Sequence, residues 1–151
     1  MGYFFRFFAA DAQGLDFLSV QTALRKLDPQ YRLEIDELRE LAVLSYGEQR
    51  LALVEINGQD DDIFQDDLAE FRDLVGDGDS PAENRVREVL QTTQTIVAVE
   101  AQWEGEDAEP VLSRIDVLWE WLFTSRKGLL QADGEGFYDA DGLILKRHFT
   151  L

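Results

Sequence analysis

The order of hydrophobic and polar positions predicts a chain that alternates between strands and helices. Residues 3–9 are rich in aromatic side chains and carry one charge, Arg6. Their apolar side chains fall on both faces of an extended segment, which is typical of a strand that is covered on two sides. Residues 95–103 show nearly the same two-sided pattern. Shorter segments bounded by turn-forming residues predict further strands at 31–36, 41–46, 50–56, 129–132, 136–139 and 143–149.

Apolar residues spaced three and four apart predict four helices, at 17–27, 62–75, 81–93 and 111–126. Ser80 and Glu83 fit a capping box, in which each residue satisfies a backbone N–H of the other at the start of the third helix. Pro110 is suited to the first turn of the fourth helix, and Gly128 is suited to its C-terminal cap.

The predicted elements follow the order β-α-β-β-β, then two helices, then β-α-β-β-β again. This order predicts the α+β class, with a mixed or antiparallel sheet and helices packed on it. We predict a single domain over 1–151, in which residues 3–57 and 95–149 are repeated halves joined by an acidic helical pair at 60–94. A ferredoxin-like arrangement is the nearest common architecture, and this analogy carries no functional information.

The net charge of the chain limits the kinds of molecule that it can bind. The chain has 31 acidic and 14 basic residues and a formal net charge of −17. Residues 51–110 hold 17 of the acids and only 3 of the bases. The negative electrostatic field of these residues repels phosphate groups, so we expect neither nucleic-acid binding nor attachment to an anionic membrane. The acidic middle of the chain either keeps the protein soluble or docks a basic partner, with nucleic-acid mimicry as a sharper form of the second role.

The residue counts exclude several kinds of chemistry. Without cysteine the chain has no disulfide, no thiol nucleophile and no cysteine-based metal site. Its one histidine, His148, has no sequence pattern of a catalytic triad around it. No apolar run reaches the roughly 18–20 residues of a membrane-spanning helix, and residues 1–10 lack the pattern of a signal peptide. We therefore expect a cytoplasmic protein with no catalytic residue, no cofactor and no bound metal.

One acidic run allows a binding role as well as a structural one. Asp60, Asp61 and Asp62, followed by Asp66 and Asp67, offer carboxylate oxygens that suit a hard cation. Acids are also favoured at the start of a helix, where they cap free N–H groups and complement the helix dipole. We interpret this run as helix capping and solvation.

A second segment, residues 133–142, holds four acids and three glycines. It forms either the rim of a ligand site, with Tyr138 available for stacking, or a strand meander that needs glycine in its turns. The spacing of the glycines favours the meander.

The fourth predicted helix has apolar positions beyond its main stripe. Val117 and Trp121 lie about 60–100° past the edge of that stripe on a helical wheel. Either a middle helix covers them, or they contact another molecule, where tryptophan is a common anchor. A homodimer with Trp121 near the contact is the simplest form of the second reading. The candidate partner-contact residues are Val117, Trp121, Asp60, Asp61, Asp66 and Asp67.

These features lead us to expect a non-enzymatic protein-interaction or regulatory module whose partner is a protein, either a basic one or a second copy. The alternative is a small-ligand-binding protein or a carboxylate-dependent enzyme with a cleft between the two halves. A flat apolar patch would favour the first reading, whereas a pocket of converging polar groups would favour the second.

Overall fold

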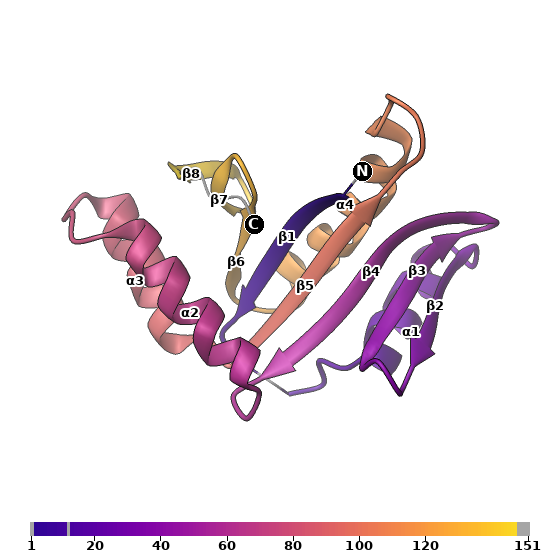
Figure 1. Cartoon of the computed structure of the whole chain (residues 1–151), viewed down its shortest axis with the longest axis horizontal. Helices are drawn as coiled ribbons and strands as arrows, with labels where there is room; N and C mark the ends of the chain where they lie inside the picture. Colours follow the sequence, from indigo (N-terminus) through magenta and orange to yellow (C-terminus); the bar gives the residue numbers. More distant parts are fainter. Residues whose placement is uncertain (1, 12, 148–151) are drawn as a thin grey trace.

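The structure is a computed structural model that describes residues 2–11 and 13–147 of the chain (Figure 1). Within these residues, four helices and eight strands follow one another in the predicted order. None of these helices combines the length and the apolar content needed to cross a membrane. The elements are β1 (Gly2–Ala9), α1 (Phe17–Leu27), β2 (Tyr31–Asp36), β3 (Leu41–Tyr46), β4 (Gln49–Gly58), α2 (Asp62–Val75), α3 (Pro81–Thr92), β5 (Thr95–Gln102), α4 (Glu109–Ser125), β6 (Gly128–Ala132), β7 (Gly136–Asp139) and β8 (Gly142–Lys146). The last predicted strand extends to 149, and its final residues lie outside the described part of the chain.

The eight strands join one antiparallel sheet in the order β2-β3-β4-β5-β1-β6-β7-β8. Strands β1 and β5 occupy its centre and pair along their full length, from Gly2 opposite Gln102 to Ala9 opposite Thr95. These are the two strands whose sequences are apolar on both faces, because both faces of the central sheet are covered. The predicted α+β class, with an antiparallel sheet and helices packed on it, is confirmed.

The two predicted halves have the same order of elements, but their meanders are attached to the centre differently. In the first half, the last meander strand β4 lies next to the centre and pairs with β5. In the second half, the first meander strand β6 lies next to the centre and pairs with β1. The two meanders therefore extend outward in opposite senses, and neither a duplicated unit nor a ferredoxin-like arrangement is confirmed.

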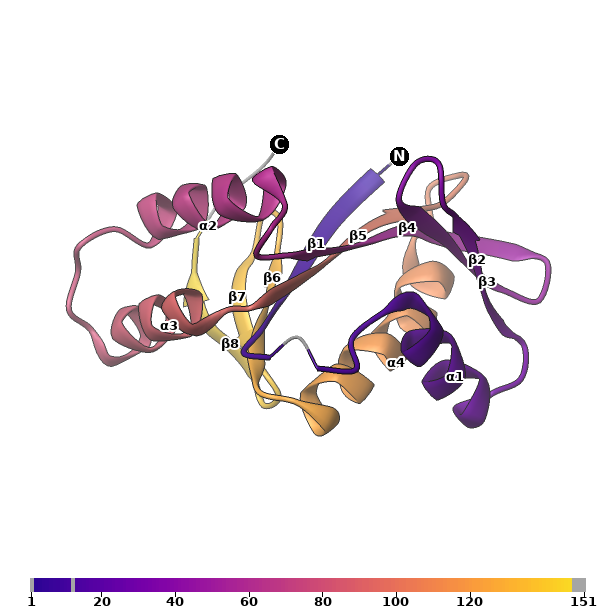
Figure 2. The ribbon, with the colours of Figure 1, turned by 90° about the horizontal axis from the view of Figure 1, so that it is seen from below.

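Helices α1 and α4 cover one face of the sheet (Figure 2). Val20 and Leu24 of α1, together with Ile115 and Leu118 of α4, are almost fully buried there. They pack with Phe7 and the inward side chains of the other strands into the larger of two hydrophobic cores. Burial of these aliphatic side chains contributes about 1.5–3 kcal/mol each.

Helices α2 and α3 cover the opposite face, at the end of the sheet that contains β6, β7 and β8. Phe64 and Phe71 of α2 and Val86 of α3 are buried against Phe8. Because successive residues of a strand point to opposite faces, β1 supplies one phenylalanine to each core. Ile63 is apolar but 53% exposed, because the buried stripe of α2 begins one position later, at Phe64.

The helix ends confirm one sequence prediction and correct another. The Ser80 side chain accepts a hydrogen bond from the Glu83 backbone, and the Glu83 side chain accepts one from the Ser80 backbone, so the capping box is confirmed. Gly128 does not cap α4, which ends with Arg126 in an extended conformation. Gly128 instead begins β6, where a Cβ atom would lie 2.2 Å from the carbonyl oxygen of Phe8. Close approach of two strands, rather than helix termination, requires the glycine.

One charged cluster lies between the sheet and α2. Arg6 of β1 is 5% exposed and donates from Nη1 to Gln131 Oε1 and to Asp133 Oδ1, both at 3.1 Å. Gln131 Nε2 donates to the same carboxylate oxygen of Asp133 at 2.8 Å. Asp67 of α2 approaches the guanidinium at 3.7 Å, and the ring of Phe71 lies 5.0 Å from it. The buried charge is thus paired, and the cluster couples β1 and β6 to α2.

Candidate functional site

The structure separates the predicted partner-contact residues into two groups on opposite faces of the sheet. Val117 and Trp121 lie on α4, and both are partly buried against the larger core. The four aspartates lie at and before the start of α2, on the other face. Neither middle helix covers the α4 pair, because α2 and α3 pack on the opposite face. Helix α1 lies beside Trp121, so of the two alternatives for this pair, cover by a middle helix is wrong.

The four aspartates have different surroundings. Asp60 and Asp66 are exposed. Asp61 occupies the N-cap position, but its side chain accepts a backbone N–H of the preceding turn at 2.9 Å, so the capping interpretation is wrong for this residue. Asp67 is partly buried, and desolvation raises its pKa despite the opposing effect of Arg6. Within the described residues, no three His, Cys, Asp or Glu side chains are placed to hold a metal ion together.

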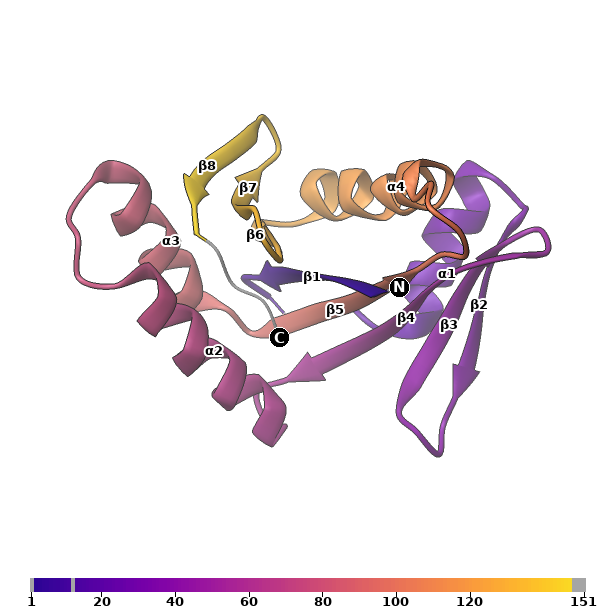
Figure 3. The same cartoon turned by 45° about the horizontal axis from the view of Figure 1, so that its top comes forward.

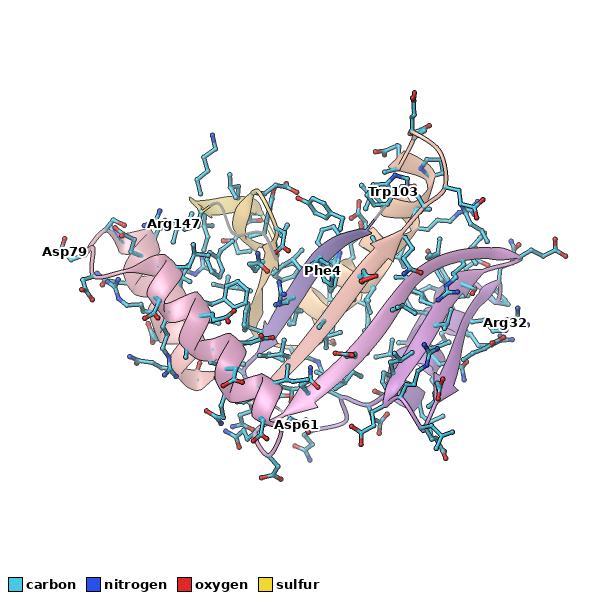
Figure 4. All side chains as sticks on the ribbon, in the orientation of Figure 1. Phe4, Arg32, Asp61, Asp79, Trp103 and Arg147 are labelled. Atoms are coloured by element: carbon cyan, nitrogen blue, oxygen red, sulfur yellow. The ribbon has the colours of Figure 1, made fainter. Side chains whose placement is uncertain are left out.

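The acidic run that follows the same helix does not converge on one point. Asp61 and Asp79 lie beyond the two ends of α2, well apart in the structure (Figure 4). Of the nine acids from Asp60 to Asp79, all but Asp67 are exposed. The acids therefore cover the outer face of α2 and the turn after it, as a solvated surface would.

A more concentrated arrangement lies between α4 and the β6–β7–β8 meander. Figure 3 shows α4 beside these strands, on the same side of the β1–β5 pair. The hollow between them has a volume of about 490 Å³, within the range of roughly 300–1,000 Å³ that is typical of ligand sites. We call it the acidic–aromatic cleft, and it is lined by Phe5, Glu109, Leu112, Asp116, Trp119, Glu120, Phe123, Leu130, Ala132, Glu135, Tyr138, Asp139, Ala140, Asp141 and Gly142.

Aromatic rings from β1 and α4 form the floor of the cleft. The ring of Phe5 lies 5.5 Å from that of Trp119 and 5.0 Å from that of Tyr3. Further along α4, the ring of Phe123 lies 5.1 Å from that of the buried Phe7. The indole N–H of Trp119 is buried and has no hydrogen-bond partner among the residues that the structure describes. Packing on the larger core holds these rings in place, so the floor is preformed.

Six carboxylates surround this floor, three on each wall. The helix wall and the meander wall supply them from sequence-distant positions, and no Lys or Arg of the described residues lines the cleft. The acids are Glu109, Asp116 and Glu120 on α4, and Glu135, Asp139 and Asp141 on the meander. Among the described residues only Asp139 of these six has an ion-pair partner, Arg85 of α3, at 2.7 Å.

Two tyrosines hold Glu135 in position. Tyr3 and Tyr138 each donate their hydroxyl to one oxygen of the Glu135 carboxylate. The hydrogen bond to Glu135 raises the pKa of Tyr138 to about 12, and burial raises the pKa of Tyr3 above its usual value. Both hydroxyls therefore remain donors at neutral pH, and they fix the turn between β6 and β7 against the end of β1.

Asp116 shows that the negative charge of the cleft lacks compensation. Partial desolvation raises the pKa of its carboxyl group, and repulsion from Glu120 and Glu109 raises it further. No nearby cation lowers it. A cationic group placed in the cleft would relieve this repulsion and favour the ionised form of Asp116.

Two other hollows of comparable size differ in chemistry. One, of about 640 Å³, lies between the β3–β4 turn and the loop before α4, and charges of both signs line it together with one aromatic ring, that of Trp103. The other, of about 630 Å³, lies between α1 and α4, and its lining is mainly apolar with one charge, Lys26. Of the three, the acidic–aromatic cleft combines several rings with carboxylates and no base, and we take it as the candidate site.

Part of this site was visible in the sequence as a different feature. Residues 133–142 form the favoured meander, but they also form one wall of the cleft, with Tyr138 among the lining residues. The three acids of α4 were missed, although their spacing of seven and four residues places them along one edge of the helix's aromatic stripe. The alternative reading of the sequence placed a cleft between the two halves. The acidic–aromatic cleft lies within residues 109–142, and among the described residues of the first half only Phe5 lines it.

The remaining residue that the sequence analysis considered, His148, lies outside the described residues. Comparisons with known protein families, with curated proteins and with solved structures find no match to this chain. Function must therefore be argued from the geometry of the chain itself.

Proposed function

We propose that the protein is a non-enzymatic binding module that docks a basic segment of a partner protein in the acidic–aromatic cleft. The observation that supports this most directly is the convergence on one hollow of aromatic rings and six carboxylates, five of which have no ion-pair partner among the described residues. Arginine and lysine side chains are attracted by both features. Carboxylates accept their charge-assisted hydrogen bonds, and an aromatic face adds about 0.5–2 kcal/mol through cation–π attraction.

The length of the helix wall favours a peptide segment over a single ion. From Glu109 to Phe123 the wall runs for about 21 Å at 1.5 Å per residue. An extended chain of about six residues covers that distance. Apolar lining residues such as Leu112 and Leu130 alternate with the acids, which suits a segment that alternates basic and apolar side chains.

The cleft combines carboxylates with aromatic rings, which suits the binding of a cation. Among the described residues no Ser, Thr, Cys, His or Lys lines it, so its carboxylates and Tyr138 are the groups in it that could act as nucleophiles. A small organic cation is a second candidate ligand, because the volume of the cleft suits one. The absence of cysteine suits a reducing compartment, and we place the interaction in the cytoplasm.

Fluorescence anisotropy with labelled peptides tests the proposal. The probes are peptides of about ten residues that alternate Arg with Leu or Lys with Leu, and the polyamine spermine serves as a competitor. We expect the Arg peptide to bind more tightly than the Lys peptide, because the planar guanidinium stacks on aromatic rings and pairs with carboxylates in a fork.

Two double variants with the same change in net charge locate the site. Asp116→Asn with Asp141→Asn removes one charge from each wall of the cleft. Asp66→Asn with Asp73→Asn removes two exposed charges from α2. The first pair should weaken binding by at least about tenfold, equivalent to about 1.4 kcal/mol, and the second by less than about threefold. Equal losses would mean diffuse attraction to an acidic protein and contradict the proposal. Spermine binding as tight as that of the peptides would instead favour a small-cation site.

A further inference from the structure

One carboxylate of the acidic–aromatic cleft is already paired with a base that comes from outside the cleft. Arg85 donates from Nη1 to Asp139 Oδ2 at 2.7 Å. Arg85 belongs to α3, which packs on the opposite face of the sheet from α4, and it does not itself line the cleft. The protein therefore supplies its own cation to an acid that the cleft would otherwise offer to a partner.

The other oxygen of Asp139 is bound by the backbone of the β7–β8 turn. Asp139 Oδ1 accepts the N–H of Asp141 at 2.8 Å and the N–H of Gly142 at 3.1 Å. Burial by itself raises the pKa of Asp139, but the hydrogen bonds from Arg85 and from the turn lower it below the usual value. Asp139 is thus a charged acceptor at neutral pH, and the turn holds it in place independently of Arg85.

The two members of this ion pair differ in their exposure to water. The side chain of Arg85 is 53% exposed, whereas that of Asp139 is 15% exposed. An ion pair with so exposed a member is weak, because water solvates the released guanidinium almost as well as the carboxylate does. A second cation can therefore displace Arg85 from Asp139, while the turn keeps the carboxylate in position.

We propose that Arg85 competes with the basic partner for Asp139 and so lowers the affinity of the cleft. This inference rests on the proposed function, because it concerns the regulation of the same site. The other five carboxylates of the cleft have no ion-pair partner in the described ranges 2–11 and 13–147, so Asp139 is the acid at which the protein opposes binding. Removal of the guanidinium makes all six acids available, and a basic segment then binds more tightly.

Fluorescence anisotropy with the peptide that alternates Arg with Leu tests this competition. Arg85→Gln removes the charge and keeps a polar side chain, and it should bind the peptide at least about threefold more tightly than the wild type. The matched control is Arg72→Gln, which removes an exposed base of α2 and changes the net charge equally. Because charges far from the cleft are screened, the control should change the affinity by less than about 1.5-fold. Circular dichroism confirms that each variant is folded.

A double-mutant cycle separates competition at Asp139 from a general change in charge. Asp139→Asn removes the carboxylate charge, while its amide oxygen can still accept the N–H groups of the turn. In this background Arg85→Gln should tighten binding by less than about 1.5-fold, because Arg85 no longer withholds an acid from the peptide.

Three results would overturn the inference alone, with peptide binding still localised to the cleft. These are an Arg85→Gln variant that binds no more tightly than the wild type, an equal gain in Arg72→Gln, and an undiminished gain in the Asp139→Asn background. If neither the wild type nor Arg85→Gln binds the peptide, the proposed function itself is wrong and the inference fails with it.

Discussion

Substitution of the buried arginine tests how far the charged cluster supports the core. Arg6→Met keeps a long unbranched side chain on the central strand and removes the guanidinium. Asp133, whose side chain is 6% exposed, then loses its ion-pair partner. One of its oxygens already has no hydrogen-bond partner among the described residues, so the amide of Gln131 is the remaining side-chain donor to this carboxylate.

The expected cost follows from the burial of that carboxylate. Removing one partner of a buried ion pair costs about 3–5 kcal/mol, because the other charge stays in a poorly solvated place. The methionine side chain recovers part of the lost packing, so we expect a loss of about 3–4 kcal/mol in the free energy of unfolding. For a chain of this size that corresponds to a fall of about 6–16 °C in melting temperature.

Urea unfolding followed by circular dichroism measures this loss. The companion variant combines Arg6→Met with Asp133→Asn, which removes the unpaired charge but keeps the shape of the side chain. It should be more stable than Arg6→Met alone, because a neutral amide costs less to bury than an unpaired carboxylate. A loss below about 1 kcal/mol in Arg6→Met, or a double variant less stable than the single one, would refute the reasoning.

Three further predictions concern the rest of the molecule. Gly128→Ala forces a methyl group against the neighbouring strand and should cost about 1–3 kcal/mol, whereas Gly58→Ala points into open space and should change stability by less than about 0.5 kcal/mol; urea unfolding compares the two. Asp67 and Asp116 have raised pKa values, so the folded state binds more protons than the unfolded state as pH falls towards the usual value of 3.8, and the melting temperature should rise on mild acidification. At still lower pH the lowered pKa of Glu83, which its hydrogen bonds with the capping serine cause, should reverse this gain, and thermal melting across the range checks both signs. Calcium at micromolar concentration should leave the melting temperature unchanged, because the acids of α2 are dispersed; a saturable rise would contradict that interpretation.

The helices and strands were predictable because residues that end a helix or favour a turn lie at their boundaries in the sequence. Helix α1 has the predicted bounds, since its apolar spacing ends at Asp28 and Pro29, which cannot continue a helix. Helix α2 likewise ends before Gly76, which has a φ of 78° that other residues rarely adopt. Apolar residues on both faces identified β1 and β5 as buried strands, and the structure places both at the centre of the sheet.

The order of the strands in the sheet was harder to predict from the sequence, because the burial of a strand does not specify which strand lies beside it. β6 is largely buried, whereas β4 is buried only near its middle, and yet both lie next to the central pair. The sequence pattern shows which face of each strand is apolar, but either end of a three-strand meander can satisfy that pattern beside the centre. The difference between the two halves therefore arises from packing across the whole sheet, which no single segment encodes.

The cleft was not predicted, because acids that are clustered along the sequence need not lie close together in the folded structure. Residues 51–110 hold most of the excess acid, but α2 and the turn after it spread the acids of 60–79 over an outer surface.

In the sequence, the charges of residues 111–151 nearly balance, with 6 acids and 5 bases. In the structure, none of those five bases lines the cleft. Arg114 lies over the ring of Tyr46 at 4.0 Å, and Arg126 pairs with Asp11 at 3.2 Å, both outside the cleft. Asp133 pairs with Arg6 in the core, and the other five carboxylates of this segment, joined by Glu109, line a hollow in which the structure describes no Lys or Arg. Repulsion among these carboxylates destabilises the protein, and a bound cation would remove that repulsion. Within the proposed function, the cation belongs to the partner.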